Sequence, residues 1–503
     1  MATGAGSSRL EGSCWGYSWF GQSWVLCQRF LVGLGKRAAT AIAREFIEQL
    51  FTLPSRFFDT RKKGDVAARL QDASQVQSTV VQILGSTTID ALVTVLSLGI
   101  VFYFSAEMGW VTLLLVPPYA LVAGLAAARL HHEHHETLGA FGRLQGSYID
   151  TLDGIETVRR SGVTAIFSEA TLALFGMFQS KVERLGHTQA FAASKLEAVG
   201  GVFLTAVLTS GAWLVLAGDL AMGAMFAAYS LAAGVLPSLQ RVTEDYFTLQ
   251  AGSAAARRLQ DVLLTEPERN PGANPFRMER ELRLDNATFQ WSPNEPLLRD
   301  VSLALHPGRI TALSGANGSG KSSLIHLVIR RYPLAEGTLS VDGVDAEMID
   351  LHNYRRNVAL VPETVKIFND SLGANLAMGA PDLSPEALLE CLHELSVESF
   401  LGRFRAGLAT EVGEDGRRLS AGERQMIGLI RALIGKPSVL IVDEGFNALD
   451  HEAFAGAMRL VTAHASLGAV LLVSHARRVI SLADECFVLE GGTVLLDTRK
   501  RAA

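Results

Sequence analysis

Long apolar runs mark the first half of the chain, and short apolar runs separated by turns fill the second half. A helix that crosses a bilayer needs about 20 mostly apolar residues. The strongest segments of this kind are residues 87–104, 110–128, 199–217 and 220–239. We therefore predict an all-α, incomplete transmembrane domain over residues 1–254, a linker at 255–280 and an α/β domain over 281–503.

The loops inside each pair of apolar segments are short and contain no lysine or arginine. They are Ser105–Gly109 and Gly218–Asp219, whereas basic residues such as Arg129 and Lys181 gather beyond the other ends of the segments. An excess of lysine and arginine marks the cytoplasmic side of a membrane protein. We therefore predict a multi-pass protein of the cytoplasmic membrane, surrounded by lipid, with both short loops outside and the second half of the chain in the cytoplasm.

The stretch Arg129–Lys195 between the two pairs has a mostly helical, polar-faced pattern. At a rise of about 1.5 Å per residue, it is long enough for two helices that run well beyond the bilayer and back. Gly154 suits the turn between them. The cluster His131–His135 suggests either a metal site or a wet helix surface, and the absence of a second ligand cluster favours the surface.

The N-terminal segment Cys14–Gly35 is rich in aromatic and apolar residues but also carries Gln22, Gln28 and Arg29. A charge at bilayer depth is costly. The segment is therefore interpreted as a damaged span, an interfacial helix or a sequence that is not native. The next stretch, Ala38–Leu53, has the pattern of an amphipathic helix.

Composition agrees with a membrane part joined to a soluble part, since 49% of residues are hydrophobic and 19% are charged. The net charge of -6 argues against a nucleic-acid partner. The four cysteines are scattered and form no CxxC pair, so neither a disulfide framework nor a zinc site is expected.

Residues 315–322 read GANGSGKS and fit the phosphate-binding loop pattern. An apolar strand, Ile310–Leu313, precedes the loop, and a helix, Ser323–Arg331, is expected to follow it. Glycines allow backbone N–H groups to turn toward phosphate oxygens, Lys321 is expected to reach the β- and γ-phosphates of ATP, and Ser322 is expected to hold Mg²⁺. The loop's expected nucleotide-binding residues are Gly315, Asn317, Gly318, Ser319, Gly320, Lys321, Ser322 and Ser323.

Two more buried strands end in residues that suit ATP hydrolysis. Val439–Val442 leads into Asp443 and Glu444, and Val470–Val473 leads into His475. In open α/β sheets, functional groups collect at the carboxyl ends of the strands. Asp443 is expected on the magnesium side of the nucleotide, and Glu444 is expected to activate water as a general base.

A second anion site is predicted where Leu419–Gln425 opens a helix. Ser420 and Gly422 would present a hydroxyl and an N–H group to a phosphate at the helix N-terminus.

In combination, these motifs resemble the half-transporters of ABC exporters over roughly Leu31–Asp497. In that family the phosphate loop is followed by a Q-loop, an LSGGQ signature, an acid pair, a D-loop and a switch histidine. The corresponding stretches here are Val361–Glu363, Leu419–Glu423, Asp443-Glu444, Asn447–Asp450 and His475.

The resemblance implies a P-loop ATPase domain with a helical subdomain and a second half-transporter chain as partner, in a homodimer or a heterodimer. It also implies that Trp291 stacks on adenine and that His475 contacts the γ-phosphate, which makes His475 catalytic together with Glu444 and Lys321. Phe57–Asp65 and Asp153–Val158 would form the regions of the two coupling helices.

Within the exporters, the stretches LPSRFFDTRKKGD and GSYIDTLDGIETVR most resemble bacterial exporters of bacteriocin-like peptides, which implies a peptide cargo. Export of a lipid or a drug stays open.

Three departures from the family pattern stand out. Glu363 replaces the Q-loop glutamine and could bind Mg²⁺ directly, Ala421 and Glu423 alter the signature, and the first of the family's six spans is missing. The last departure suggests a truncated copy, a misassigned start or a protein that lacks a helix.

Two functions of different classes fit these patterns. The first is ATP-driven export by a dimer, in which each ATP lies between one chain's phosphate loop and the other chain's signature. The second is a degenerate or regulatory chain that binds nucleotide without transport. A soluble ATPase of DNA repair or translation is excluded by the apolar spans.

Overall fold

The computed structural model describes residues 7–61, 63–292 and 295–496. The chain divides into two compact units, one made of residues 1–53 and 61–266 and the other of residues 54–60 and 267–503. The side chains of residues 7–28 lie outside the described part. Most of the segment Cys14–Gly35, for which the sequence left several interpretations, is therefore described by its backbone alone.

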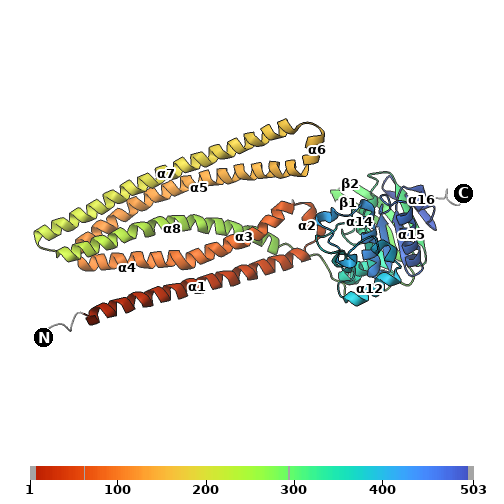
Figure 1. Ribbon diagram of the computed structural model, residues 1–503, viewed down its shortest axis with the longest axis horizontal. Coiled ribbons are helices and arrows are strands. Elements are labelled where there is room, and N and C mark those ends of the chain that lie inside the picture. Colours follow the sequence, from red (N-terminus) through yellow and green to blue (C-terminus); the bar gives the residue numbers. More distant parts are fainter. Residues whose placement is uncertain (1–6, 62, 293–294, 497–503) are drawn as a thin grey trace. The chain divides into compact units, whose positions relative to one another are not determined.

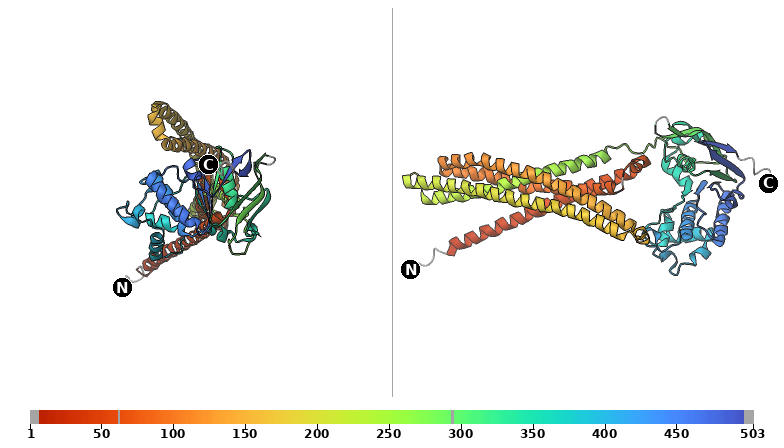
Figure 2. Two further views of the ribbon diagram at one scale, coloured as in Figure 1. Left: turned by 90° about the vertical axis from the view of Figure 1, so that its right-hand side faces the viewer. Right: turned by 90° about the horizontal axis from the view of Figure 1, so that it is seen from above.

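The first unit is built of helices, as predicted. Helices α5 and α7 lie side by side along their lengths, and α6 joins them at one end (Figures 1 and 2). The helices are α1 (Ser7–Thr52), α3 (Lys63–Gln82), the π-helix η1 (Ile83–Thr87), α4 (Thr88–Phe104), α5 (Ala106–Asp153), α6 (Ile155–Arg160), α7 (Thr164–Ala217) and α8 (Met222–Leu263).

Within the described residues, four helical segments are long and apolar enough to cross a membrane. They are Arg69–Phe104, Ala106–Asp153, Thr164–Ala217 and Met222–Leu239, and each contains most or all of one apolar segment expected from the sequence. Helix α8 continues to Leu263, so it extends through the first residues of the stretch that the sequence analysis took as linker.

The helices of this unit pack around a buried apolar cluster that includes Met108, Tyr119, Phe203 and Val207. An ion pair also joins α4 to α8, where the guanidinium of Arg241 lies 2.6 and 2.8 Å from the carboxylate oxygens of Asp90.

The histidine cluster His131–His135 lies on α5, and all four of its histidines are exposed. Its one acid, Glu133, is buried and accepts a hydrogen bond of 2.9 Å from Arg184 on α7. Among the residues that the structure describes, no group of three or more histidine, cysteine or acidic side chains is placed to hold a metal ion. Glu133 therefore links the two long helices of the hairpin.

The second unit combines two sheets with helices, which is the α/β class expected. An antiparallel sheet has the order β2-β1-β4-β5, and a mostly parallel sheet has the order β10-β9-β3-β8-β7-β6. The strands are β1 (Leu282–Ser292), β2 (Glu295–Leu305), β3 (Ile310–Gly315), β4 (Glu336–Val341), β5 (Val344–Asp345), β6 (Val358–Val361), β7 (Val439–Asp443), β8 (Ala469–Val473), β9 (Glu485–Glu490) and β10 (Thr493–Leu496).

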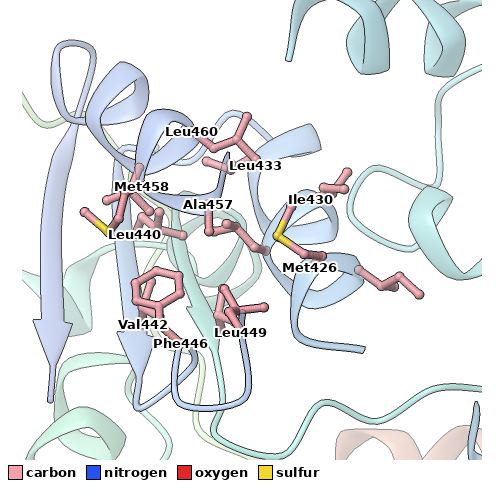
Figure 3. Close-up of a cluster of buried hydrophobic side chains, with 14 of the residues drawn as sticks. Met426, Ile430, Leu433, Leu440, Val442, Phe446, Leu449, Ala457, Met458 and Leu460 are labelled. Atoms are coloured by element: carbon pink, nitrogen blue, oxygen red, sulfur yellow. The ribbon is translucent and has the colours of Figure 1, made fainter. Parts of the chain in front are cut away.

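Helices cover the parallel sheet and bury its apolar strands. Side chains of α14 (Ala421–Ile434) and α15 (His451–Ala465), such as Leu433 and Leu460, belong to one buried apolar cluster with Leu440 and Val442 of β7 (Figure 3). The remaining helices of this unit are α2 (Ser55–Asp59), α9 (Lys321–Val328), α10 (Leu351–Asn357), α11 (Leu372–Ala377), α12 (Pro385–Glu394), α13 (Glu398–Leu401) and α16 (Arg477–Ile480), with 3₁₀ turns η2 (Ala346–Met348), η3 (Gly407–Ala409) and η4 (Glu414–Gly416).

Helix α9 begins and ends earlier than the sequence predicted. Gly320 precedes the first turn with a φ of 104°, which is readily accessible to glycine, so the helix already begins at Lys321. Arg330 has a φ of 52°, which is incompatible with continuing a right-handed helix.

Candidate nucleotide site

Four neighbouring parallel strands end at one edge of the sheet and bring the predicted site residues together. Strands β3, β8, β7 and β6 are adjacent and parallel. They lead into the phosphate loop, His475, the Asp443-Glu444 pair and Glu363 respectively. The chain therefore places the expected phosphate, metal and water-activating groups at the carboxyl ends of adjacent strands, where α/β sheets hold ligands.

The phosphate loop follows β3 and has the shape of a backbone cradle. Gly318 and Gly320 have φ angles of 79° and 104°, and a Cβ atom at Gly320 would lie 2.9 Å from a side-chain carbon of Leu298. The hydroxyl oxygen of Ser319 is buried and has no hydrogen-bond partner within the described part of the chain. Turned backbone amides and an unsatisfied buried hydroxyl fit a phosphate group.

Lys321 lies inside this cradle. Its side chain is almost fully buried, and its ammonium group donates hydrogen bonds of 2.8 and 3.0 Å to the carbonyl oxygens of Gly315 and Ala316. The loop backbone thus holds the cation at the site where phosphate oxygens would lie. Ser322 at the start of α9 is exposed, whereas Ser323 is buried.

The carboxyl groups at the ends of β7 and β6 interact with each other. Burial is the main cause that raises the pKa of Asp443 from 3.8 to about 6, and the charges of Glu444 and Glu363 add to it, while Lys321 opposes it. The carboxyl groups of Asp443 and Glu363 and the hydroxyl of Ser322 are oxygen donors of the kind that Mg²⁺ prefers. Since no three acidic side chains of the described residues are placed to hold a metal ion, a magnesium ion here would also need phosphate oxygens and water as ligands.

Glu444 has an unusual backbone conformation and a fixed side chain. Its φ is 48°, a left-handed value that side-chain-bearing residues seldom adopt. One carboxylate oxygen lies 3.3 Å from Nδ1 of His475, and the other accepts a 3.2 Å hydrogen bond from the amide of Asn447. Strained residues of this kind persist where surrounding bonds hold them, which is common in active sites.

The aromatic side chain expected to stack on adenine lies beside a cluster of aromatic rings. Trp291 is 45% exposed, and its ring packs edge-to-face against Phe289 and Tyr332 at centroid distances of 5.1 and 5.0 Å. The exposed part of the ring is free to stack on a planar base, while its neighbours hold its orientation.

The short helix α2 belongs to the same compact unit and contacts this aromatic cluster. The carboxylate of Asp59 accepts hydrogen bonds of 2.6 Å from the hydroxyl of Tyr332 and 3.1 Å from Arg331. Arg56 donates a 3.4 Å bond to the carbonyl oxygen of Trp291. Helix α2, which overlaps the stretch Phe57–Asp65 that resembles the first coupling region, is thus tied to residues that surround Trp291.

The signature residues are held by the D-loop. Ser420 is the N-cap of α14, and a Cβ atom at Gly422 would lie 3.2 Å from the carbonyl oxygen of Ala448. The side chain of Gln425 accepts a 3.3 Å hydrogen bond from the N–H of Ala448. Within the described part of the chain, no hydrogen bond or ion pair connects Ser420 or Gly422 to the phosphate loop.

Known proteins resemble this chain in both of its parts. The family model for the ABC transporter transmembrane region matches residues 16–239, and the ABC transporter model matches residues 298–447. The chain is an ABC exporter half-transporter. Accordingly, it resides in the cytoplasmic membrane, binds ATP and couples ATP hydrolysis in a cytoplasmic domain to transport.

Curated relatives of this ABC exporter act on different kinds of molecule. An ATP-dependent lipid A-core flippase from Saccharophagus degradans is 27% identical over 92% of this chain and 79% of its own length. The cyclolysin secretion/processing ATP-binding protein CyaB from Bordetella pertussis is 28% identical over 88% of this chain, which spans 63% of that protein. A bacterial Atm1-family ABC exporter with ATP bound shares the fold, with a TM-score of 0.83, 21% identity, and coverage of 98% of this chain and 88% of that one.

The sequence of this ABC exporter did not reveal which residues would fix the catalytic ones in place. Asn447 was named as part of the D-loop, but its bond to Glu444 was not predicted. Tyr332 was missed altogether, since a single tyrosine after a helix carries no pattern. An amide three residues after a proposed general base is a signal that could have identified Asn447.

The raised pKa of Asp443 predicts a pH-dependent stability difference for this ABC exporter. Because the folded chain retains a proton on Asp443 between pH 3.8 and about 6, ionisation of Asp443 lowers the stability of the fold as pH rises through that window. Asp443→Asn should therefore raise the free energy of unfolding at pH 7.5 by about 1 kcal/mol, a value reduced for partial exposure. Thermal unfolding without nucleotide and Mg²⁺ should show a smaller gain at pH 5, and an equal gain at both pH values would contradict the prediction.

Proposed function

We propose that two half-transporter chains enclose two ATP molecules, each between the phosphate loop of one chain and Ser420 and Gly422 of the other. One half of this site, contributed by the chain whose phosphate loop binds the ATP, would carry out hydrolysis. Its support is that one sheet edge brings together the phosphate loop, Asp443, Glu444 and His475. The N-terminus of α14 has no hydrogen bond or ion pair to the phosphate loop among the described residues, which supports the half contributed in trans. The chain carries both halves, so identical chains can form the pair.

The proposed roles follow from the side-chain chemistry. Trp291 stacks on adenine and residues 315–323 bind the phosphates, while Ser322, Asp443 and Glu363 would hold Mg²⁺, which would neutralise phosphate charge. Glu444 accepts a proton from the attacking water, and its bonds to Asn447 and His475 fix the carboxylate for that transfer. His475 also donates to the γ-phosphate, where negative charge develops during hydrolysis.

For cargo, we propose a peptide. The resemblance of the cytoplasmic stretches to exporters of bacteriocin-like peptides supports this, and so does the similarity to a cyclolysin secretion protein. The similarity to a lipid A-core flippase favours a lipid as the second candidate. The two cargo classes share the same ATP chemistry, so the cargo has to be distinguished by transport itself.

Inside-out vesicles that contain the full chain provide the test. With ATP and Mg²⁺, we expect a labelled cationic peptide library to accumulate in the lumen, and we expect a Glu444→Gln chain in matched vesicles to accumulate none. Fluorescent lipid A analogues in the same vesicles serve as the second arm. Translocation of the lipid without peptide uptake would replace the peptide proposal with the lipid one, and absence of ATP hydrolysis would overturn both.

The bond between Asp59 and Tyr332 predicts a coupling defect. Replacement of Asp59 with alanine removes the hydrogen bonds from Tyr332 and Arg331 to a charged acceptor, and bonds of this class are each worth about 1.5–3 kcal/mol. We expect cargo transport per ATP hydrolysed to fall about 5- to 10-fold, while hydrolysis stays within about two-fold. Both rates should be measured in the same vesicles.

Tyr332→Phe is the matched variant for this prediction because it removes only the bond from Tyr332, leaves the bond from Arg331 to Asp59, and keeps the ring that packs on Trp291. The double variant should then show no larger coupling defect than Asp59→Ala alone. Additive defects, or normal coupling in Asp59→Ala, would show that this bond does not transmit motion.

A further inference from the structure

The N-terminus of α14 already carries an anion from its own chain. The carboxylate oxygen Oε2 of Glu423 accepts a 2.7 Å hydrogen bond from the backbone N–H of Ser420 and a 2.9 Å bond from the hydroxyl of Ser420. In return, the hydroxyl oxygen of Ser420 accepts a 3.2 Å bond from the N–H of Glu423. Both partners of this capping box are therefore satisfied within four residues.

This arrangement determines where the hydroxyl proton of Ser420 points. A serine hydroxyl has one proton to donate, and here the acceptor is Glu423. The carboxylate also lies at the helix end whose partial positive charge favours anions. A phosphate that approaches Ser420 thus meets a donor already in use and a negative charge beside it.

Among the residues that the structure describes, no cation forms an ion pair with the Glu423 carboxylate. Glu423 is half-buried, so water screens its charge only in part. Its carboxylate therefore acts on any phosphate that binds to Ser420 and Gly422.

We propose that Glu423 is an intrachain competitor of the γ-phosphate, a positioning residue that holds the Ser420 hydroxyl until ATP on the partner chain displaces it. This inference rests on the proposed pairing of Ser420 with the partner's ATP. When the γ-phosphate binds, the Ser420 hydroxyl turns from the Glu423 carboxylate to a phosphate oxygen, and the backbone bond from Ser420 to Glu423 keeps the helix capped. Glu423 consequently raises the ATP concentration at which the two chains close.

Glu423→Gln tests the competition in the full-length chain reconstituted in nanodiscs. The glutamine carbonyl can still accept the N–H of Ser420, but the charge is gone and the acceptor is weaker. We expect the ATP concentration for half-maximal hydrolysis to fall about 3- to 5-fold, with the maximal rate unchanged within about two-fold. Glu423→Asp, which keeps the charge, should show no such fall.

Glu386→Gln is the matched control for an effect on helix capping. Glu386 lies in the first turn of α12, whose N-cap is Ser384, and its pKa is lowered by a backbone hydrogen bond and by Ser384. The Glu386→Gln variant should lower thermal stability about as much as Glu423→Gln does. It should not change the ATP concentration for half-maximal hydrolysis.

The outcomes separate this inference from the proposed function. An unchanged or higher half-maximal ATP concentration in Glu423→Gln overturns the competition and leaves Glu423 as a helix cap alone. Ser420→Ala, measured alongside, should reduce the maximal rate. If Ser420→Ala leaves hydrolysis unchanged, the pairing of Ser420 with ATP fails, and the competition fails with it.

Discussion

Replacing Glu444 with glutamine is expected to reduce ATP hydrolysis about 100- to 1,000-fold while ATP binding persists. Glutamine keeps the size of the side chain and can still bond to Asn447, but it cannot take a proton from water. Steady-state hydrolysis and retention of labelled ATP, both measured in the full-length chain with Mg²⁺, would show the separation.

Glu452→Gln is the control for this prediction, because Glu452 is an exposed acid in the first turn of α15, outside the site. It should hydrolyse ATP at the normal rate. If Glu444→Gln also hydrolysed at the normal rate, the export proposal would fail and the degenerate nucleotide-binding chain would become the better interpretation.

Lys321→Ala is expected to weaken ATP binding about 10- to 100-fold, the range for loss of a hydrogen-bonded charge. The ammonium lies within the phosphate loop on the carbonyl oxygens of Gly315 and Ala316, so it is already positioned for phosphate oxygens. Equilibrium binding of a fluorescent ATP analogue to the full-length chain would measure the change.

Lys321→Arg provides the comparison, because it keeps the charge but replaces a compact ammonium with a planar guanidinium. Its affinity should lie between those of the wild type and Lys321→Ala. ATP binding by Lys321→Ala at wild-type affinity would show that the loop holds phosphate through its backbone alone.

The sequence predicted site residues best where the local backbone conformation or the end of a strand restricts which residue type can stand at a position. Gly318 and Gly320 could be assigned to the phosphate loop because their positions need backbone angles that glycine reaches easily. Asp443 and Glu444 could be placed at the site because an apolar run ends directly before them. Such constraints are local, so one stretch of sequence is enough to read them.

Contacts between distant residues could not be read in this way. The bond from Asp59 to Tyr332 joins positions 273 residues apart, and neither residue belongs to a repeating pattern. The raised pKa of Asp443 depends on burial and on Glu363 from another strand, which only the folded sheet brings near. Even the local bond between Ser420 and Glu423 was missed, because Glu423 was treated as a departure from a motif rather than as a capping residue.

The ATPase unit is assembled from two separate pieces of the chain. Helix α2 belongs to the ATPase unit, whereas the residues on both sides of it belong to the membrane unit, and the chain returns to the ATPase unit near residue 267. Because α2 is synthesised before residues 61–266 and the rest of the ATPase unit after them, the contacts between α2 and the rest of that unit can form only once the helices of the membrane unit have been made.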